Sequence, residues 1–459
     1  MKYRLFAVFS VFFAVLGFVS CFSDDDEVEL SRDCIITSIS MGTLNRGLPT
    51  KTADGRDSTY WVSVTGSLYP LHIDHYRGLI YNTDSLPKGT DVSKVVFSAA
   101  NASSSITVRS LYSGQDTIFV KTDSLDCRVS RILTVHATDG VSKRSYVLTV
   151  NVHQEEGDSS NWKQMGPYSA FQGVTEMKAT AAFGKLYVVG KRQNGVRLLV
   201  AETATVGEVA DPWKVVDVDV PLKSTSFVFF QKKFYSLTEE GVLMMSADAQ
   251  NWETVPTDFR AERLVACGKQ YIIAYANGAF YSSEDACNWV KDGADEPQYL
   301  PDGYVSGTCV VNKNNPTFET FVVVGKCKGV NRVWRREVDM TSTEIFPWVH
   351  LPETPGSAYN FPDVDNYAFH AYDGGTLMTA VDKQGWLWPL TISYDNGRTW
   401  MGNLLTTPVK GQADSWTSAV DDNNHVWLLS APDGGLWRGR VNRLGWNSED
   451  GVFEKSKRK

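Results

Sequence analysis

Ten polar and aromatic side chains stand just before or at the start of short apolar runs in the later part of the sequence. They combine carboxylates, cations and aromatic rings, and a sugar-binding surface requires this mixture because a pyranose offers C–H patches and hydroxyls together. We therefore expect a ligand-binding surface here, although each aromatic ring could instead serve only as packing between structural repeats. The ten candidates are Glu176, Lys178, Arg260, Glu262, Arg263, Tyr304, Asp365, Tyr367, Asp414 and Trp416.

Two carboxylate pairs in the same stretches could support a different chemistry, the hydrolysis of an extracellular polysaccharide. Asp363 with Asp365, or Glu262 with Asp302, would serve as acid and base if held about 5–9 Å apart. Loop carboxylates more often brace turns or face solvent. A glycoside hydrolase or lyase is therefore the alternative function, and no residue is assigned a catalytic role.

Several other chemistries lack their signature. The chain has 459 residues, with 45 Lys and Arg against 53 Asp and Glu, so its net charge of −8 gives no general attraction to a nucleic-acid backbone. The Asp363-x-Asp365 string lacks the Gly and Glu that complete an EF-hand loop. The seven His and seven Cys show no zinc-ligand spacing. We predict no nucleic-acid partner, no metal and no cofactor.

The elements that position the candidates are predicted to be strands, because the chain is rich in Gly and aromatic residues and has almost no long stretch with an apolar period of 3.6. In residues 161–450, Trp residues recur near strand ends, and a period of about 40–50 residues indicates a β-propeller. We predict six blades, with seven as the alternative, and a ring closed by a strand at Asn161-Trp162. The recurring residues are Trp162, Trp213, Trp252, Trp289, Trp348 and Trp400.

A short phrase precedes three of these Trp residues, and it is complete as Ser-x-Asp-x-Gly-x-Thr-Trp at 393–400. The phrase resembles the Asp-box, or BNR repeat, of sialidase-like propellers. In such a turn the Asp accepts hydrogen bonds from turn N–H groups, Gly takes a positive φ and Trp packs between blades, so the role is structural. The structural residues are Ser246, Asp248, Trp252, Ser283, Asp285, Trp289, Ser393, Asp395, Gly397 and Trp400.

Sialidase activity itself is not favoured. The resemblance would further imply an Arg-Ile-Pro phrase and three Arg side chains that clamp a carboxylate. The chain has no Arg-Ile-Pro, and only Arg260 and Arg263 precede an expected innermost strand. One blade cannot by itself supply a clamp of three Arg residues.

A smaller all-β module is predicted before the propeller, in residues 31–155. Short alternating runs at 60–64, 79–81, 105–108, 132–135 and 146–150 are separated by turns, a pattern typical of an Ig-like β-sandwich. Cys34 and Cys127 lie near its two ends and could form a disulfide. A polar stretch at 154–160 is the expected linker.

The first twenty residues are predicted to be a lipoprotein signal peptide. Lys2 and Arg4 precede an uncharged apolar run at 5–19, and the string that ends in Cys21 resembles a bacterial lipobox. An ordinary signal peptide with an incidental Cys is the alternative. Residues 21–30 form an acidic tether that resembles the export signal of Bacteroidetes surface lipoproteins, with a plain solvated tether as the alternative.

Taken whole, the chain resembles an uncharacterised family of Bacteroidetes surface lipoproteins with an Ig-like module and an Asp-box propeller. The resemblance implies a lipid on Cys21, attachment to the outer membrane and exposure on the cell surface. It also implies a sandwich that acts as a spacer, but it brings no assigned activity. Our first hypothesis is a non-catalytic protein whose propeller mouth binds an extracellular glycan or protein. A scaffold for an outer-membrane protein complex is a further alternative.

Overall fold

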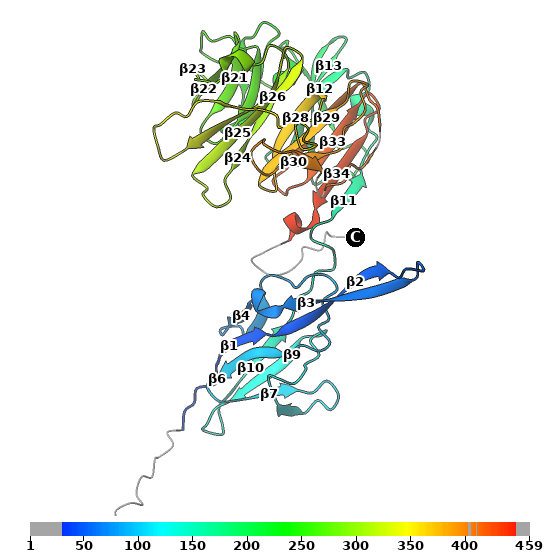
Figure 1. Cartoon of the computed structure of the whole chain (residues 1–459), viewed down its shortest axis with the longest axis vertical. Helices are drawn as coiled ribbons and strands as arrows, with labels where there is room; N and C mark the ends of the chain where they lie inside the picture. The colour runs from blue at the N-terminus through cyan, green and yellow to red at the C-terminus, as the bar shows by residue number, and fades with distance from the viewer. Residues whose placement is uncertain (1–29, 403–404, 410, 447–459) are drawn as a thin grey trace, which may run out of the picture. The chain divides into compact units, whose positions relative to one another are not determined.

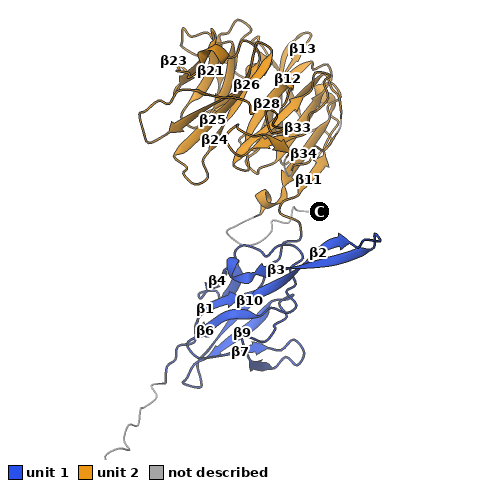
Figure 2. Cartoon of the chain, viewed as in Figure 1, with its two compact units in different colours: residues 1–154, 447–459 blue, residues 155–446 orange. Residues whose placement is uncertain are grey.

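The computed structural model describes residues 30–402, 405–409 and 411–446. The chain forms two compact units, residues 1–154 with 447–459, and residues 155–446 (Figure 2). Cys21, the predicted signal peptide and most of the acidic tether lie outside the described residues. Within the described ranges, no helix combines the length and apolar character needed to cross a bilayer.

The first unit is a β-sandwich, as predicted. Its larger sheet has the order β4-β5-β10-β9-β7-β8, a second sheet pairs β1 with β6, and β2 and β3 form a separate hairpin (Figure 1). All pairs are antiparallel except β5 with β10. The strands are β1 (Ile36–Met41), β2 (Thr43–Lys51), β3 (Asp57–Thr65), β4 (Leu71–Asp74), β5 (Leu79–Asn82), β6 (Phe97–Ala102), β7 (Ser105–Arg109), β8 (Asp116–Ile118), β9 (Arg131–His136) and β10 (Lys143–Thr149).

The alternation of apolar and polar residues explains how these strands share one core. In β10, Tyr146 and Leu148 are buried while Val147 between them is exposed, because successive side chains point to opposite faces of a sheet. Ile36 of β1 and Leu133 of β9 belong to the same buried cluster. The two sheets therefore face one another across a common hydrophobic core.

The possible disulfide between Cys34 and Cys127 is not present. Both residues are free thiols, and so are the other four described cysteines. Cys127 is buried in the sandwich core, and burial raises the pKa of its thiol to about 12. Cys127 therefore acts as a small apolar core residue.

The second unit is a β-propeller whose described residues form six four-stranded antiparallel sheets, as predicted (Figure 1). We call these blades 1 to 6 in chain order of their first, innermost strands. The strands are, for blade 1, β12 (Glu176–Ala182), β13 (Lys185–Arg192), β14 (Gly195–Glu202) and β15 (Lys214–Val218); for blade 2, β16 (Val228–Phe230), β17 (Lys233–Leu237), β18 (Leu243–Ser246) and β19 (Glu253–Thr254); for blade 3, β20 (Arg263–Cys267), β21 (Ile272–Ala276), β22 (Ala279–Ser283) and β23 (Val290–Lys291); for blade 4, β24 (Val305–Val311), β25 (Phe318–Cys327), β26 (Val330–Asp339) and β27 (Val349–Leu351); for blade 5, β28 (Asp365–Tyr372), β29 (Gly375–Val381), β30 (Thr391–Ser393) and β31 (Met401–Gly402); and for blade 6, β32 (Ser415–Val420), β33 (Val426–Ala431), β34 (Leu436–Val441) and β11 (Ser160–Gln164).

The first strand of the unit closes the ring. β11 pairs antiparallel with β34, with Trp162 opposite Gly439, so blade 6 takes its outer strand from the start of the unit and its other three strands from the end. The sequence predicted this closure at Asn161-Trp162. Closure removes a sheet edge that would otherwise be open to other chains.

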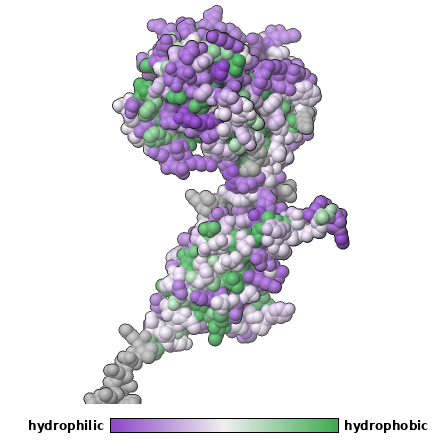
Figure 3. Space-filling model, viewed as in Figure 1, coloured by the Kyte–Doolittle hydropathy of each residue, from purple (hydrophilic) through white to green (hydrophobic). Residues whose placement is uncertain are grey.

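The second strand of each blade carries most of the core. Every residue of β21, β29 and β33 is buried, because each of these strands has a neighbouring blade on both of its faces. Such strands are largely apolar and do not alternate. Polar side chains dominate the propeller surface visible in Figure 3.

The three Ser-x-Asp turns are braced as predicted. The Asp248 carboxylate accepts hydrogen bonds from the backbone N–H groups of Gln250 and Asn251, at 2.9 Å each, and Trp252 folds back to donate to the Ala249 carbonyl at 2.9 Å. The turn at Asp285 repeats this arrangement.

The third turn differs in the residue that takes the left-handed conformation. It is one residue longer, and both Asn396 (φ +57°) and Gly397 (φ +93°) are left-handed, whereas each of the other two turns has a single left-handed alanine. Gly397 accepts the hydrogen bond from Trp400. The Asp395 carboxylate accepts from Ser393 and Thr399. These aspartates serve turn geometry.

Candidate functional site

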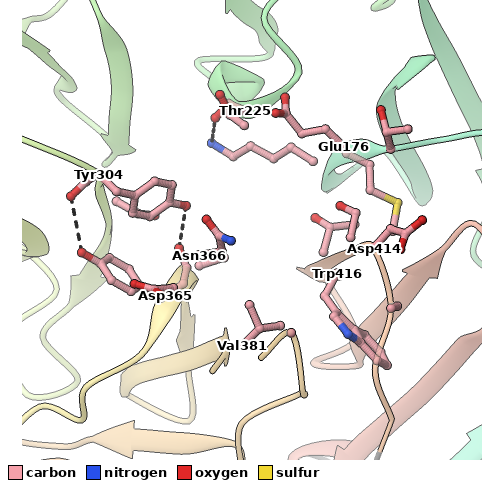
Figure 4. A pocket seen from close by; sticks show the side chains of 18 of the residues that line it. Glu176, Thr225, Tyr304, Asp365, Asn366, Val381, Asp414 and Trp416 are labelled. Atoms are coloured by element: carbon pink, nitrogen blue, oxygen red, sulfur yellow. Dashed lines mark hydrogen bonds between the residues drawn. The ribbon is translucent and has the colours of Figure 1, made fainter. Parts of the chain in front are cut away.

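A pocket of about 430 Å³ lies where the innermost strands of the propeller begin (Figure 4). Its walls come from β12, β20, β24, β28 and β32, together with the short 3-10 helix η3 (Ser224–Ser226) that precedes β16. All six blades therefore contribute to one cavity, and its volume falls within the usual range for small-molecule sites.

Eight of the ten predicted residues line this pocket, and Arg260 and Glu262 do not. Arg260 is exposed and its guanidinium donates to the carbonyls of Thr257 and Phe259, while the Glu262 carboxylate accepts from the backbone N–H of Asn277 at 2.7 Å. Local backbone groups hold both side chains outside the pocket. The eight lining residues are Glu176, Lys178, Arg263, Tyr304, Asp365, Tyr367, Asp414 and Trp416.

Tyr304 and Arg263 form one wall. The guanidinium carbon of Arg263 lies 4.1 Å from the centre of the Tyr304 ring, a cation–π contact, and its Nη1 donates to the Val305 carbonyl at 3.2 Å. The Tyr304 hydroxyl donates to the Tyr367 carbonyl at 2.9 Å (Figure 4). One face of the Tyr304 ring is thus already covered by Arg263.

Tyr367 cannot offer an aromatic face to a ligand, contrary to prediction. Its side chain is fully buried among blades 4 and 5. The cause is a register shift in β28 between Asp365 and Ala368, at which Asn366 takes a φ of +46°. Such a bulge changes which residues face the core, so Asn366 is exposed at the pocket and Tyr367 points inward.

Lys178 lines the pocket, and its Nζ donates to the Thr225 carbonyl at 3.2 Å. Desolvation by the surrounding protein, followed by the charge of Arg263, lowers the pKa of this amine to about 8. Burial and then the charge of Lys178 lower the pKa of His370 to about 4. His370 is therefore neutral at pH 7.

The carboxylates of the pocket mostly have partners of their own. Asp365 pairs with Lys326, Glu176 accepts from the Ser224 hydroxyl, and Asp382 accepts from two backbone N–H groups of its own turn. Asp414 lies across the pocket from Tyr304 and is exposed (Figure 4).

Trp416 is the aromatic side chain of the pocket with a face that a ligand could reach. It is half-buried at the pocket wall beside Asp414 (Figure 4), and its ring is 5.9 Å from Trp437 at an angle of 32°. Trp437 supports the ring from behind, so Trp416 is positioned without being enclosed.

Several lining residues were missed by the sequence analysis. Asp382 and Lys383 follow β29, a second strand, whereas the ten predicted residues all lie before or at the start of innermost strands. Second strands end at the same mouth as innermost strands begin. The small polar residues gave no signal because Ser and Thr are common in all strands and turns. The missed residues include Thr225, Ser306, Asn366, Asp382, Lys383, Ser415 and Thr417.

No group of three or more His, Cys, Asp or Glu side chains in the described part of the chain is placed to hold a metal ion. The donors of the pocket are instead a lysine, an arginine, amide and hydroxyl groups, and separated carboxylates. This set suits hydrogen bonding to an organic ligand.

Two family models match the chain. The "DUF6242 beta propeller domain" matches residues 156–449, and the "Domain of unknown function (DUF6242) N-terminal domain" matches residues 39–150. No curated protein matches the sequence.

Solved structures with similar folds share little sequence with the chain. The WD40 domain of Toxoplasma gondii coronin is 9% identical over 65% of this chain and 89% of its own, with a TM-score of 0.37. YCF48 from Cyanidioschyzon merolae is 12% identical over 68% and 91%, with a TM-score of 0.33. PorZ from Porphyromonas gingivalis, a surface component of the type-IX secretion system, is 10% identical over 87% and 62%, with a TM-score of 0.32. At this level of similarity the matches identify no function.

Proposed function

The chain belongs to the DUF6242 family, and from the site that its propeller carries we propose that it is a non-catalytic protein that binds an extracellular glycan. A propeller of this kind suits a binding or scaffold role. The observation that supports glycan binding is the lining of the pocket, where one accessible aromatic ring stands among hydroxyl, amide and carboxylate groups. These groups match the two surfaces of a sugar, its C–H face and its hydroxyls.

The pocket is less suited to hydrolysis. Acid–base cleavage of a glycosidic bond needs two carboxyl groups that face the scissile bond from opposite sides. Asp365 is held by Lys326 and Asp363 by Lys383, while Glu262 and Asp302 accept from the backbone N–H groups of Asn277 and Lys328 outside the pocket. Each carboxylate of the two predicted acid–base pairs is therefore already bound by another group, and we propose ligand binding rather than hydrolysis.

We further propose that the protein is displayed on the cell surface by a lipid on Cys21. The proposal rests on the apolar run at 5–19 and the acidic run that follows the cysteine. The variant Cys21→Ala should release the protein from the membrane fraction. Protease added to intact cells should degrade the wild-type protein, and resistance to protease would instead place it on the periplasmic side.

The glycan proposal is tested with the full chain carrying Cys21→Ala, screened against an array of glycans. We expect at least one reproducible ligand, with binding lost in Trp416→Ala at an unchanged melting temperature. Trp416→Phe should keep part of the affinity because it keeps a stacking ring. Trp61→Ala is the matched control, since Trp61 is an exposed tryptophan of the sandwich unit.

Three results would contradict the proposal. A well-folded protein that binds no glycan would favour a protein partner, to be sought by cross-linking at the cell surface. Release of reducing ends from a bound glycan would make the protein a hydrolase. If both Trp416 variants unfold, this ring belongs to the core and does not bind the ligand.

A further inference from the structure

We propose that the pocket binds a small anionic group, such as the carboxylate of an acidic sugar, between Lys178 and Arg263. This inference rests on the proposed function and narrows it, because it identifies the chemical class of the ligand. It rests on one contrast: among the described residues, the two cations have no ion-pair partner, whereas most carboxylates of the pocket are already bound by other groups.

The two cations use only neutral partners. Within residues 30–402, 405–409 and 411–446, neither Lys178 nor Arg263 takes part in an ion pair. Lys178 donates to the Thr225 carbonyl, and Arg263 donates to the Val305 carbonyl and covers the Tyr304 ring. A lysine ammonium has three N–H donors and a guanidinium has five, so donors remain on both groups.

The nearby carboxylates are already engaged and do not neutralise these cations. Asp365 pairs with Lys326 on β25, and Glu176 accepts from Ser224. Asp414 lies across the pocket from Tyr304, whose ring is in contact with the Arg263 guanidinium (Figure 4). The carboxylates nearest the two cations are thus held by Lys326 and Ser224, and Asp414 is on the far side of the pocket from Tyr304.

The electrostatics of Lys178 agree with this arrangement. Desolvation and the like charge of Arg263 lower the pKa of its amine to about 8. Two cations that repel one another inside a pocket are stabilised when an anion binds between them. His370, a buried neighbour of Lys178, does not add a third charge, because burial lowers its pKa to about 4.

The rest of the pocket suits the remainder of an acidic sugar. Asn366 can both donate and accept, Asp414 can accept from hydroxyls, and Trp416 offers a ring face for C–H groups. With its carboxylate between the two cations, a uronic acid would direct its hydroxyls toward Asn366 and Asp414. A neutral hexose would leave both cations unmatched.

The test compares D-glucuronate with D-glucose as probes, by ligand-observed NMR on the full chain carrying Cys21→Ala at neutral pH. We expect saturable binding of glucuronate that is stronger than that of glucose. Lys178→Met and Arg263→Gln should each weaken it by roughly 10- to 100-fold, as expected for loss of a charge-assisted hydrogen bond. The melting temperature of each variant should equal that of the wild type, which shows that the variant is folded. Arg263→Lys keeps the positive charge and should retain part of the affinity.

Two matched controls lie outside the pocket lining. Lys223 also donates its Nζ to a backbone carbonyl, that of Glu262 at 2.9 Å, and Arg332 also lies over a tyrosine ring, at 5.3 Å from the centre of Tyr299. Lys223→Met and Arg332→Gln should leave glucuronate binding unchanged. Equal loss in these controls would show that the effect of the pocket variants is only a general change in charge.

The outcomes separate this inference from the proposed function. A neutral glycan that binds through Trp416 and is insensitive to Lys178→Met and Arg263→Gln overturns the anion site and keeps glycan binding. Saturable glucuronate binding that depends on both cations, with no hit on the glycan array, keeps the anion site and overturns the glycan proposal. Failure to bind glucuronate overturns the anion site.

Discussion

Replacing Gly439 with alanine tests how the propeller ring is closed. Gly439 lies on β34 opposite Trp162 of β11, and a Cβ added at this glycine would stand 2.2 Å from Cδ2 of the Trp162 ring. Non-bonded carbon atoms normally approach to no less than about 3.5 Å. The Trp162 ring, or β11 itself, must therefore move by about 1.3 Å.

The cost follows from two opposing effects. Forcing an extra carbon into a packed contact typically costs about 1–3 kcal/mol. The change also relieves the entropic penalty of glycine in a strand, which is about 0.5–1 kcal/mol. We expect a net loss of about 1–2 kcal/mol in the free energy of unfolding, and a fall of about 2–8 °C in the melting temperature.

Tryptophan fluorescence is a suitable assay because it reports mainly on the propeller unit. Of the fourteen tryptophans, only Trp61 lies in the sandwich unit. The Gly439→Ala variant should unfold at lower urea concentration than the wild type. Gly402→Ala is the matched control, since a Cβ at Gly402 meets no atom within 4 Å. In the Trp162→Ala background Gly439→Ala should be neutral or stabilising. An equal loss in both backgrounds would refute the steric argument.

Three further predictions concern buried or perturbed charges. Asp292→Asn should destabilise the protein by about 3–5 kcal/mol in urea unfolding, because it leaves the Arg336 guanidinium, 2.8 Å away and fully buried, without its counter-charge. The hydrogen bonds from Asn288 lower the pKa of Asp285 to about 2. The stability that the Asp285 carboxylate gives to its turn is therefore present above about pH 4 and is lost as the pH falls toward 2. In Asp285→Ala, acid titrations of the free energy of unfolding should lack this loss. Glucuronate affinity should fall as the pH rises through about 8, where Lys178 loses its proton, and a flat profile from pH 6 to 9.5 would contradict the assignment.

The groups around Lys178 make this last prediction specific. Glu176 on its own strand, Arg263 and Cys267 on β20, and His370 on β28 are the charged or titratable neighbours. Burial raises the pKa of Cys267 to about 12, and His370 is neutral above about pH 4. Lys178 is therefore the member of this group that titrates near pH 8.

The blade architecture could be predicted because its signals are local. The Ser-x-Asp phrases mark turns whose hydrogen bonds all lie within seven or eight residues. The phrase Asn161-Trp162 was recognisable as an outer strand that lacked preceding strands, and β11 does complete blade 6. The strands of the sandwich were equally visible in their alternation.

The pocket was predicted less well, because its composition depends on details of the backbone that sequence patterns do not report. The bulge at Asn366 inverts the face of one residue and moves Tyr367 into the core. Arg260 and Glu262 precede an innermost strand, as a pocket residue should, yet nearby backbone groups bind both. Identifying their partners requires three-dimensional positions.

The pairing of β11 with β34 also determines when the propeller can form and where it bears load. The two strands come from opposite ends of the unit, so during synthesis blade 6 stays incomplete until β34 has left the ribosome, and earlier blades wait with an unsealed ring. Tension on the chain before this unit acts first on residues 156–159, which are joined to Asn442 and Arg443 by hydrogen bonds and an ion pair. The five-residue ladder of β11 with β34 comes next along the chain, so the two segments that close the ring are also the ones that receive such a load.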